Sequence, residues 1–375
     1  MTTTPAQARI DLAAIRHNVG ILRERAGGTP LMGAVKADAY GHGLVPTSEA
    51  LVAAGVSRLG TAYLREGLAL RAAGITVPVL SWILTPGEPF DEALRQDVEL
   101  SASDVRLLEE IAAAARATGI TAKVHLEADT GMSRGGSPLA AWPALVAKAV
   151  ELQAEGAVEV VGLWSHFASA DIPGDPSIRM QLDQFEIALK QAEQAGAAGS
   201  HVMRHIANSA AIMTLPEARY DLVRPGIAMY GLSPIPEMGD FGLRQVMTLT
   251  ARIALAKRVP ENSGVSYGLL YVTDRETTLG LVPLGYADGI LRHATGRVEV
   301  LAGGRRRAIA GRVCMDQFMI DVGDDPLAAG DEVILFGPGK DGESTLQEWA
   351  DNLGTITHEI VTRLGARVPR VYEGA

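Results

Sequence analysis

The sequence is poor in cysteine and in positive charge and has no long apolar run, and each shortage excludes a class of protein. Among its 375 residues there is one cysteine, Cys314, so no disulfide can form within the chain, as is typical of a reducing compartment. The formal charge of −10 gives no global basic surface for nucleic acid or an anionic membrane. No apolar run approaches the roughly 18 residues that span a bilayer, and the opening MTTTPAQARIDL lacks the cationic and apolar regions of a secretory signal. These features predict a soluble, cytoplasmic protein that binds neither nucleic acid nor membrane.

What the sequence does contain is a regular alternation of short apolar runs with alanine-rich helical stretches. One such stretch, 103–119, has a serine N-cap signal, a helix-period apolar stripe and a closing glycine. Strands alternating with helices predict parallel βαβ units, and about eight of them favour a closed (β/α)8 TIM barrel, with an open doubly wound sheet as the alternative. The runs expected to form strands are 31–35, 58–62, 77–82, 98–102, 122–129, 158–167, 201–209 and 221–231.

The composition changes near residue 237, where β-branched runs divided by Gly, Pro, Asn and Asp replace the alternation. This change predicts a barrel over 1–236 and a mainly β domain over 237–375 with one helix at 346–354, although roughly the first 10–15 residues are free to pack with the β domain. Gly303 and Gly304, between two β-branched runs, predict a two-residue hairpin turn. The basic cluster at 303–308 is interpreted as a solvated strand face rather than an anion site.

Polar side chains gather where the predicted barrel strands end, which is the face that carries the chemistry of such barrels. A lysine amine together with hydroxyl groups and helix N-termini suits pyridoxal phosphate. No metal is predicted, because His201 and His205 lie on an expected strand, where they form no helical chelate, and the glutamate of a zinc motif is missing. The polar groups at the strand ends are Lys36, Trp82, Glu127 with Asp129, His166, Asn208 with Ser209, and Arg224.

Nine motifs give the chain a resemblance to a known family, and the resemblance extends from about residue 9 to Tyr372. The chain resembles alanine racemases, in which these motifs are expected in the same order. The resemblance implies a fold-type III enzyme that depends on pyridoxal 5′-phosphate, with a barrel followed by a β domain and a head-to-tail homodimer. The motifs are AVKADAYGHG, DTGMSRGG, SHFASAD, HIANSAA, VRPGIAMYG, VSYG, PLGYADG, GRVCMDQ and RVPRVY.

The resemblance implies how the cofactor is held. Lys36 is expected to bind the cofactor aldehyde, and Tyr40 is expected to donate to its phosphate. Arg224 is expected to face the pyridine nitrogen, where a permanently charged guanidinium discourages ring protonation, and His166 is expected to hydrogen-bond Arg224. Arg134 is expected to reach both the phenolate oxygen of the cofactor and the substrate carboxylate. The further cofactor contacts implied are Asn208, Ser209 and the amides of Gly226 and Ile227.

The resemblance also implies two proton-transfer groups on opposite faces of the substrate, Lys36 for the D-alanine proton and Tyr267 for the L-alanine proton. Tyr267 lies in the β domain and is expected to come from the partner subunit, so that the homodimer shares its active sites. Met315 is expected to offer its backbone N–H to the substrate carboxylate. Around these groups, Tyr286 and Arg312 are expected to line the entrance, Asp316 to be a polar gate residue and Cys314 to be a packed side chain.

Two positions depart from the family pattern. The family usually has a tyrosine where this chain has His358, and we expect His358 to bind the phosphate from the partner subunit, its protonated form favoured by that anion. Many members have a carbamylated lysine seven residues before the arginine that matches Arg134, where this chain has Glu127. Glu127 is already a carboxylate, and we expect it to pair electrostatically with Arg134, with a water or small anion filling any gap.

The function implied is an alanine racemase that supplies D-alanine for peptidoglycan, and three alternatives are kept beside it. An amino-acid decarboxylase of the same fold type is disfavoured by Arg224, because those enzymes place an acidic residue at the ring nitrogen. A non-catalytic cofactor carrier is disfavoured by Tyr267 and its domain, since a carrier needs no second base. A racemase of another small amino acid, such as serine, stays open.

Overall fold

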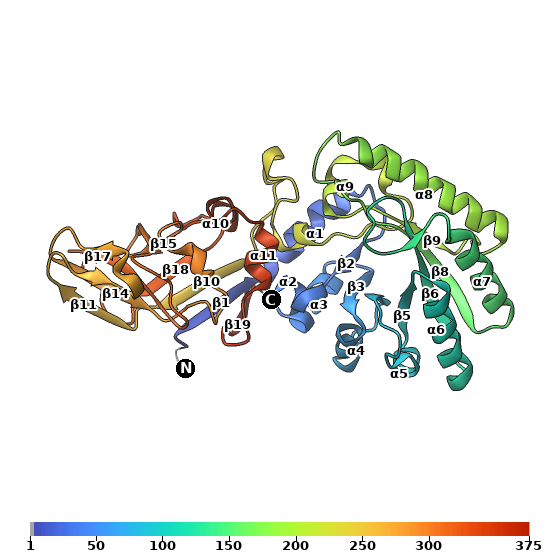
Figure 1. Ribbon diagram of the computed structural model, residues 1–375, viewed down its shortest axis with the longest axis horizontal. Helices are drawn as coiled ribbons and strands as arrows, with labels where there is room; N and C mark the ends of the chain where they lie inside the picture. The colour runs from blue at the N-terminus through green and yellow to red at the C-terminus, as the bar shows by residue number, and fades with distance from the viewer. Residues whose placement is uncertain (1–3, 375) are drawn as a thin grey trace.

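The computed structural model describes residues 4–374, which form two regions lying side by side (Figure 1). Strands surrounded by helices lie on the right in Figure 1, and a group of β-sheets lies on the left. No helix of the described residues is both long and apolar enough to cross a membrane. The polar face predicted from the sequence belongs to the region on the right.

The region on the right is the closed parallel barrel that the alternation of strands and helices predicts. Its labelled strands pair in the order β2-β3-β4-β5-β6-β8-β9, each parallel to the next. The eighth place is filled by the extended segment 221–225. Met32 N donates to Val223 O at 2.8 Å on one side, and Arg224 N donates to Ala207 O at 2.9 Å on the other. The strands are β2 (Met32–Ala34), β3 (Arg58–Tyr63), β4 (Val79–Ile83), β5 (Val98–Ala102), β6 (Ala122–Asp129), β8 (Val158–Trp164) and β9 (Met203–His205), with β7 (Ser137–Pro138) paired beside β6.

Helices follow the strands around the barrel, as α6 illustrates. Asp104 caps this helix by accepting from Leu107 N at 2.8 Å, one residue after the serine that the sequence suggested, and Gly119 ends it in the left-handed conformation at φ 69°. The barrel helices are α1 (Leu12–Arg25), α2 (Lys36–Tyr40), α3 (Leu44–Ala53), α4 (Leu64–Ala72), α5 (Phe90–Arg95), α6 (Val105–Thr118), α7 (Trp142–Ala154), α8 (Pro176–Ala195) and α9 (Ser209–Thr214). Short 3-10 turns follow at η1 (Pro216–Ala218), η2 (Ile227–Tyr230) and η3 (Pro236–Met238).

The region on the left is mainly β, as predicted. A six-stranded sheet has the order β16-β15-β18-β10-β1-β19, and smaller sheets are formed by β11-β14-β17 and by β12-β13. Strand β1 (Ala6–Asp11) runs antiparallel to β10 and parallel to β19, so both ends of the described chain join this sheet. The other elements are β10 (Met247–Arg252), β11 (Leu255–Val259), β12 (Gly264–Val265), η4 (Tyr267–Leu269), β13 (Tyr271–Val272), β14 (Thr277–Val282), η5 (Arg292–Ala294), β15 (Glu299–Ala302), β16 (Arg305–Ala308), β17 (Phe318–Gly323), β18 (Glu332–Phe336), α10 (Leu346–Leu353), α11 (Thr357–Thr362) and β19 (Arg370–Glu373).

Local predictions fare differently in the two regions. The hairpin at Gly303 and Gly304 is confirmed, with φ of 59° and 74° at the two glycines, because a tight hairpin turn of this kind needs positive φ at both places. The helix at 346–354 is confirmed as α10, whereas α11 was not predicted. The single strand expected over 221–231 is wrong beyond Pro225, since the chain turns at Gly226 into η2.

Candidate active site at the carboxyl ends of the barrel strands

Lys36 lies where β2 ends and α2 begins, on the rim formed by the carboxyl ends of the barrel strands. Its Nζ atom is 6.0 Å from the ring centroid of Tyr40 and 6.0 Å from that of Trp82. Burial lowers the pKa of Lys36, and the charges of Arg134 and Arg224 lower it further. The rim therefore holds an amine whose neutral form is favoured by its surroundings.

The chain after Lys36 makes a left-handed turn. Residues 37–40 all have φ between 52° and 57°, although none of them is glycine, and each such residue costs about 1–2 kcal/mol relative to the right-handed form. Glu66 stabilises the turn by accepting from Ala37 N at 2.7 Å, and Arg370 donates to Gly41 O at 2.9 Å. Backbone strain of this kind concentrates at functional sites, and here it fixes the placement of the lysine and the tyrosine.

Tyr40 is buried against a turn that leaves little space. A Cβ atom on Gly226 would lie 2.4 Å from Tyr40 Oη, so only glycine permits this approach. Ser209 Oγ accepts from Gly226 N at 2.8 Å and thus lies beside the same turn. Asn208 contributes differently from the expectation, because its side chain caps α9 by accepting from Ala211 N at 3.0 Å. The hydroxyl groups of Tyr40 and Ser209 and the start of η2 at Ile227 lie together here. Hydroxyl and backbone N–H groups are the hydrogen-bond donors that a phosphate group requires.

His358 requires a correction. It was expected to reach the site from the partner subunit, but its ring centroid lies 5.9 Å from that of Tyr40 in the same chain. The reason is that the chain after α11 returns to β1 through β19, while Arg370 binds the loop after Tyr40. His358 Nδ1 is buried without a hydrogen-bond partner among the described residues. Burial and the charge of Lys36 lower the pKa of His358 to about 4, so the protonated form expected beside a phosphate is not favoured by the protein alone.

Arg224 is held on the rim by several hydrogen bonds within the barrel. It is buried, and it donates through Nη2 to Ser165 O at 2.7 Å and to His166 Nδ1 at 3.1 Å. Its Cζ atom lies 4.8 Å from the ring centroid of Trp164. Burial lowers the pKa of Arg224 to about 9, which still leaves it charged at neutral pH, and burial with the same cation lowers that of His166 well below its usual value. The arginine is thus held rigidly beside a neutral imidazole.

Glu127 lies beneath the loop that carries Arg134. A Cβ atom on Gly135 would lie 3.2 Å from Glu127 Oε1, so the loop packs directly on the carboxylate. Burial raises the pKa of Glu127 to about 7, against the opposing effects of Arg224 and Arg134. The ion pairs within 4.0 Å in residues 4–374 do not include a direct Glu127–Arg134 contact. Both arginines influence the carboxyl group electrostatically from a longer distance, and the pairing of Glu127 with Arg134 stays a prediction.

Asp129 shapes the same loop and was not assigned a role from the sequence. Its Oδ1 atom accepts from the backbone N–H groups of Gly131, Met132 and Ser133 at 3.0–3.1 Å. An aspartate two residues before glycine is a signal for such a turn, so the sequence did contain this information.

Tyr267 lies in the β region, and 71% of its surface is exposed. Ser266 Oγ donates to Arg312 O at 2.6 Å and lies 3.3 Å from Cys314 Sγ, which brings this loop onto the segment 312–316. Cys314 is half-buried there.

The segment around Met315 is held by backbone contacts and by one arginine. Tyr286 N donates to Cys314 O at 3.1 Å, and a Cβ atom on Gly285 would lie 2.3 Å from Met315 O. Arg367 binds Asp288 and Asp316 at 3.0 and 2.8 Å, which fastens the two loops together. Tyr267, Tyr286, Arg312 and Met315 thus lie on connected loops of one surface, apart from the Lys36 rim in sequence and in domain.

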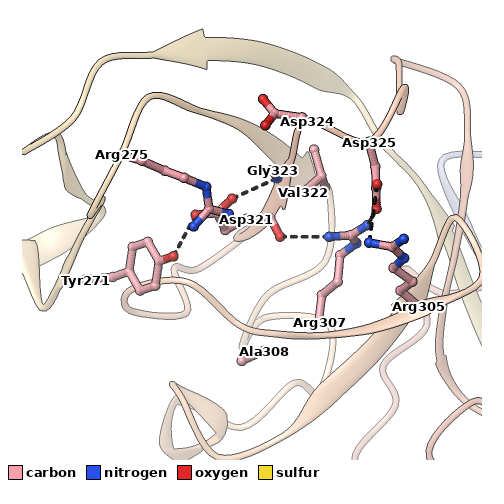
Figure 2. A pocket seen from close by; sticks show the side chains of 10 residues that line it. All are labelled: Tyr271, Arg275, Arg305, Arg307, Ala308, Asp321, Val322, Gly323, Asp324 and Asp325. Atoms are coloured by element: carbon pink, nitrogen blue, oxygen red, sulfur yellow. Dashed lines mark hydrogen bonds and ion pairs between the residues drawn. The ribbon is translucent and has the colours of Figure 1, made fainter.

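A separate hollow of about 450 Å³ lies among the strands of the β region (Figure 2). The charged side chains that line this hollow form ion pairs and hydrogen bonds with their neighbours. Arg305 and Arg307 both bind Asp325, and Tyr271 Oη donates to Asp321 Oδ2 at 2.6 Å. None of the residues predicted for the site lines this hollow.

An amine at the first strand of a barrel, faced by a buried arginine and a hydroxyl-lined turn, defines the class of enzymes that bind pyridoxal phosphate on a barrel rim. The family models for the alanine racemase N-terminal and C-terminal domains match residues 10–234 and 246–372. The alanine racemase of Frankia casuarinae is 59% identical over 368 residues, covering 97% of this chain and 95% of its own length, and that of Streptomyces coelicolor is 56% identical, covering 98% and 95%. The crystal structure of alanine racemase from D-cycloserine producing Streptomyces lavendulae has a TM-score of 0.97 at 53% identity, covering 100% of this chain and 98% of its own. The chain belongs to the alanine racemase family and is a pyridoxal-phosphate-dependent isomerase.

Proposed function

We propose that the chain interconverts L- and D-alanine with bound pyridoxal 5′-phosphate, using Lys36 and Tyr267 as its two proton-transfer groups. The observation that carries the proposal is the setting of Lys36, whose half-buried amine has its pKa lowered by burial, Arg134 and Arg224. A lowered pKa leaves more of the amine neutral near pH 7, and only the neutral amine accepts a proton. When bound, the cofactor withdraws electrons from the α-carbon and makes its proton removable.

The residues around Lys36 fit the phosphate end of the cofactor. The support is the space that Gly226 leaves beside Tyr40 and the buried, unbonded Nδ1 atom of His358. In this proposal Tyr40, Ser209 and His358 bind the phosphate, all from the chain that carries Lys36, with the N–H groups of Gly226 and Ile227 beside them. Asn208 acts by capping α9 behind Ser209.

The other end of the site binds the cofactor ring and the substrate carboxylate. Arg224, fixed by His166, faces the ring nitrogen. Arg134 binds the substrate carboxylate and the phenolate oxygen of the ring, and Glu127 beneath its loop orients it electrostatically. The Met315 N–H group offers a second contact to the carboxylate.

The two proton-transfer groups act on opposite faces of the substrate. Lys36 moves the proton of D-alanine and the Tyr267 hydroxyl moves that of L-alanine. Tyr286 and Arg312 line the entrance and keep it narrow enough for small substrates. Asp316, fixed by Arg367, is the polar gate residue.

We further propose a head-to-tail homodimer in which Tyr267 acts in the partner's site. Its support is a pair of exposed apolar surfaces, since a monomer seldom exposes large contiguous apolar patches. The β surface consists of Tyr267, Leu269, Leu270, Tyr286 and Met315, exposed by 44–71%. The rim surface consists of Tyr63 and Ile83 at the ends of β3 and β4, Ile172 from the loop after β8 and Met180 from α8, exposed by 45–55%. In a two-fold dimer each surface covers its counterpart on the partner.

D-alanine formed in this way would serve peptidoglycan synthesis in the cytoplasm, where the single Cys314 stays reduced. Serine is the second candidate substrate, because one additional hydroxyl group is a small difference for a pocket to reject. The carrier and decarboxylase alternatives are not favoured beside the family assignment.

Borohydride reduction of the holoenzyme, followed by peptide mass analysis, tests where the cofactor binds. The mass of the reduced cofactor is expected on the peptide that contains Lys36. A label on Lys123, which pairs with Asp97 at 2.8 Å at the opposite end of the barrel, would contradict the proposal. Chiral analysis after incubation with L-alanine and L-serine decides the substrate, and turnover of alanine is expected to exceed that of serine.

A further inference from the structure

A series of buried, hydrogen-bonded polar side chains crosses the interior of the barrel behind Arg224. Arg224 Nη1 lies 2.8 Å from His205 Nδ1, His205 Nε2 lies 2.9 Å from His125 Nδ1, and His125 Nε2 lies 3.0 Å from Glu99 Oε2. Arg58 binds the same carboxylate oxygen at the far end. These residues come from β3, β5, β6, β9 and the segment 221–225, and the two histidines are fully buried.

The chemistry of these groups fixes the direction of every hydrogen bond. A guanidinium group only donates, so His205 Nδ1 must accept from Arg224. A neutral His205 then carries its proton on Nε2 and donates to His125 Nδ1. His125 in turn carries its proton on Nε2 and donates to the carboxylate of Glu99. The network therefore assigns the same tautomer to both histidines, and the assignment depends on an acceptor at position 99.

The charge states agree with this order. Burial lowers the pKa of His125, and burial with Arg224 lowers that of His205 well below its usual value, so the neutral form of both rings is favoured. Burial by itself would raise the pKa of Glu99, but His125 and Arg58 hold it at about 2, so this group is an anion.

The barrel backbone leaves space for the hydrogen bonds that connect Arg224 to Glu99. A Cβ atom on Gly162 would lie 2.0 Å from His125 Nδ1, so only glycine at this place in β8 lets the ring reach His205. Trp164 packs on the other side, with its ring 5.9 Å from that of His205 and nearly parallel to it at 6°. Gly162 and Trp164, which are not part of this series of hydrogen bonds, thus have shapes that accommodate its two histidines.

We propose that Glu99 is a positioning residue for the active site, acting through His125 and His205 to keep Arg224 oriented and donating toward the ring nitrogen of the cofactor. The inference rests on the proposed function, in which Arg224 faces that nitrogen. The carboxylate is a fixed anion in a medium of low dielectric, where charge acts over several hydrogen bonds. Its loss removes the negative charge that strengthens each hydrogen bond from Glu99 back to Arg224, so His205 accepts less strongly from Arg224 and holds it less firmly.

Neutron diffraction from deuterium-exchanged crystals of the holoenzyme tests the hydrogen-bond order directly. Deuterium is expected on Nε2 of both His125 and His205 and on neither Nδ1. Deuterium on His205 Nδ1, or on both nitrogens of either ring, would overturn the proposal. This result does not depend on the substrate, so it stands apart from any failure of the proposed alanine reaction.

Glu99→Gln tests the consequence for the site. The expected results are a shifted absorbance maximum of the bound cofactor and a kcat lowered about ten- to a hundred-fold, the range typical of outer partners, with KM changed less. Glu99→Asp, which keeps the charge, should recover part of both. Glu159→Gln is the matched control, because Glu159 is exposed on β8, and it should leave absorbance and kcat unchanged.

A double variant separates positioning from folding. Glu99→Gln leaves Arg58 as a buried cation without its partner, which can prevent folding. Arg58→Met with Glu99→Gln removes both charges and keeps an acceptor for His125. If the role is positioning, the folded double variant still shows the absorbance shift and the lowered kcat. Wild-type absorbance and kcat in the double variant would show that the carboxylate only neutralises Arg58, and the proposal would be wrong.

Discussion

The rim around Lys36 and the loop around Tyr267 are built in opposite ways. Lys36 is half-buried, follows the closed barrel and is surrounded by side chains whose contacts lie within one chain. Tyr267 lies on a short 3-10 turn with 71% of its surface exposed, among other exposed apolar side chains. The rim is organised within one chain, whereas the Tyr267 loop leaves most of the tyrosine side chain exposed.

In the proposed two-base site, this difference means that the parts around the two bases are stabilised separately. The strained turn at 37–40 is stabilised by Glu66 and Arg370 within the chain. In the Tyr267 loop, Ser266 hydrogen-bonds to the backbone of Arg312. The apolar side chains of this loop stay exposed, because nothing among residues 4–374 packs over them. Changes at the rim should therefore act in isolated chains, and changes at the loop should act through assembly.

The largest effect is expected from Lys36→Ala. Loss of the amine removes both the cofactor anchor and one base, so kcat should fall by at least about 10³-fold, at the upper part of the range for a general base. Lys123→Ala at the other end of the barrel should retain activity. Alanine racemisation measured by chiral chromatography compares the two, and substantial activity in Lys36→Ala would break the assignment.

Tyr267→Phe should also lower the rate of racemisation, by about 10²–10⁴-fold. Proton exchange through Lys36 should remain. In deuterium oxide, the variant should still exchange the α-proton of D-alanine through Lys36 but should lose exchange from L-alanine. Proton NMR follows both exchanges. The control is Tyr271→Phe, whose hydroxyl binds Asp321 away from the site, and equal exchange of both enantiomers in Tyr267→Phe would contradict the two-base account.

Glu127→Gln should have an intermediate effect on catalysis and a distinct effect on stability. The pKa of Glu127 is raised from 4.5 to about 7 by burial, so between these values the folded protein keeps a proton that the unfolded chain has lost. The free energy of unfolding should therefore fall as pH rises through this window, by about 3 kcal/mol in total. Denaturant titrations at several pH values should show this slope in the wild type and a smaller slope in Glu127→Gln.

The same variant, assayed above pH 7 where Glu127 has lost its proton, should lower kcat/KM about ten-fold, equivalent to ~1.4 kcal/mol, because Arg134 then loses an orienting anion. Glu151→Gln on the exposed face of α7 is the control for both measurements. A reversible loss of wild-type activity on removal of carbon dioxide would show that a carbamate is needed after all, against the role given to Glu127.

The smallest effect on turnover is expected from His358→Ala, because this change acts on the binding of the cofactor and not on proton transfer. One hydrogen bond to a charged phosphate contributes about 1.5–3 kcal/mol, so the Kd of pyridoxal phosphate should rise at least about ten-fold. Fluorescence titration of the cofactor-free protein measures this change, with His293→Ala at an exposed position as the control. Unchanged cofactor affinity together with unchanged alanine kinetics would remove His358 from the site.

The sequence predicted the barrel and the rim because both depend on local patterns. Period and turn signals indicate strands, and a barrel brings the strand ends together, which is how Lys36 and Arg224 were found. The left-handed turn at 37–40 carried no such signal, since none of its residues is glycine. Glu99, His125 and His205 were missed because their contacts depend on the closure of the barrel and not on any spacing along the chain.

His358 illustrates a different limit. The motif that contains it suggested a phosphate contact, but no sequence pattern states which subunit supplies a residue. The parallel pairing of β19 with β1 and the contact of Arg370 with Gly41 determine that this histidine lies beside Tyr40 of its own chain.

The central claim, that each site joins the rim of one chain to the Tyr267 loop of the other, is tested most directly by mixing two inactive variants. Lys36→Ala and Tyr267→Phe chains are allowed to exchange subunits, and alanine racemisation is measured after heterodimers are verified by mass spectrometry. A heterodimer with shared sites has one site with both wild-type groups, so random exchange should restore about one quarter of the wild-type activity in a two-fold dimer. Verified heterodimers with no more activity than the separate variants would contradict the account.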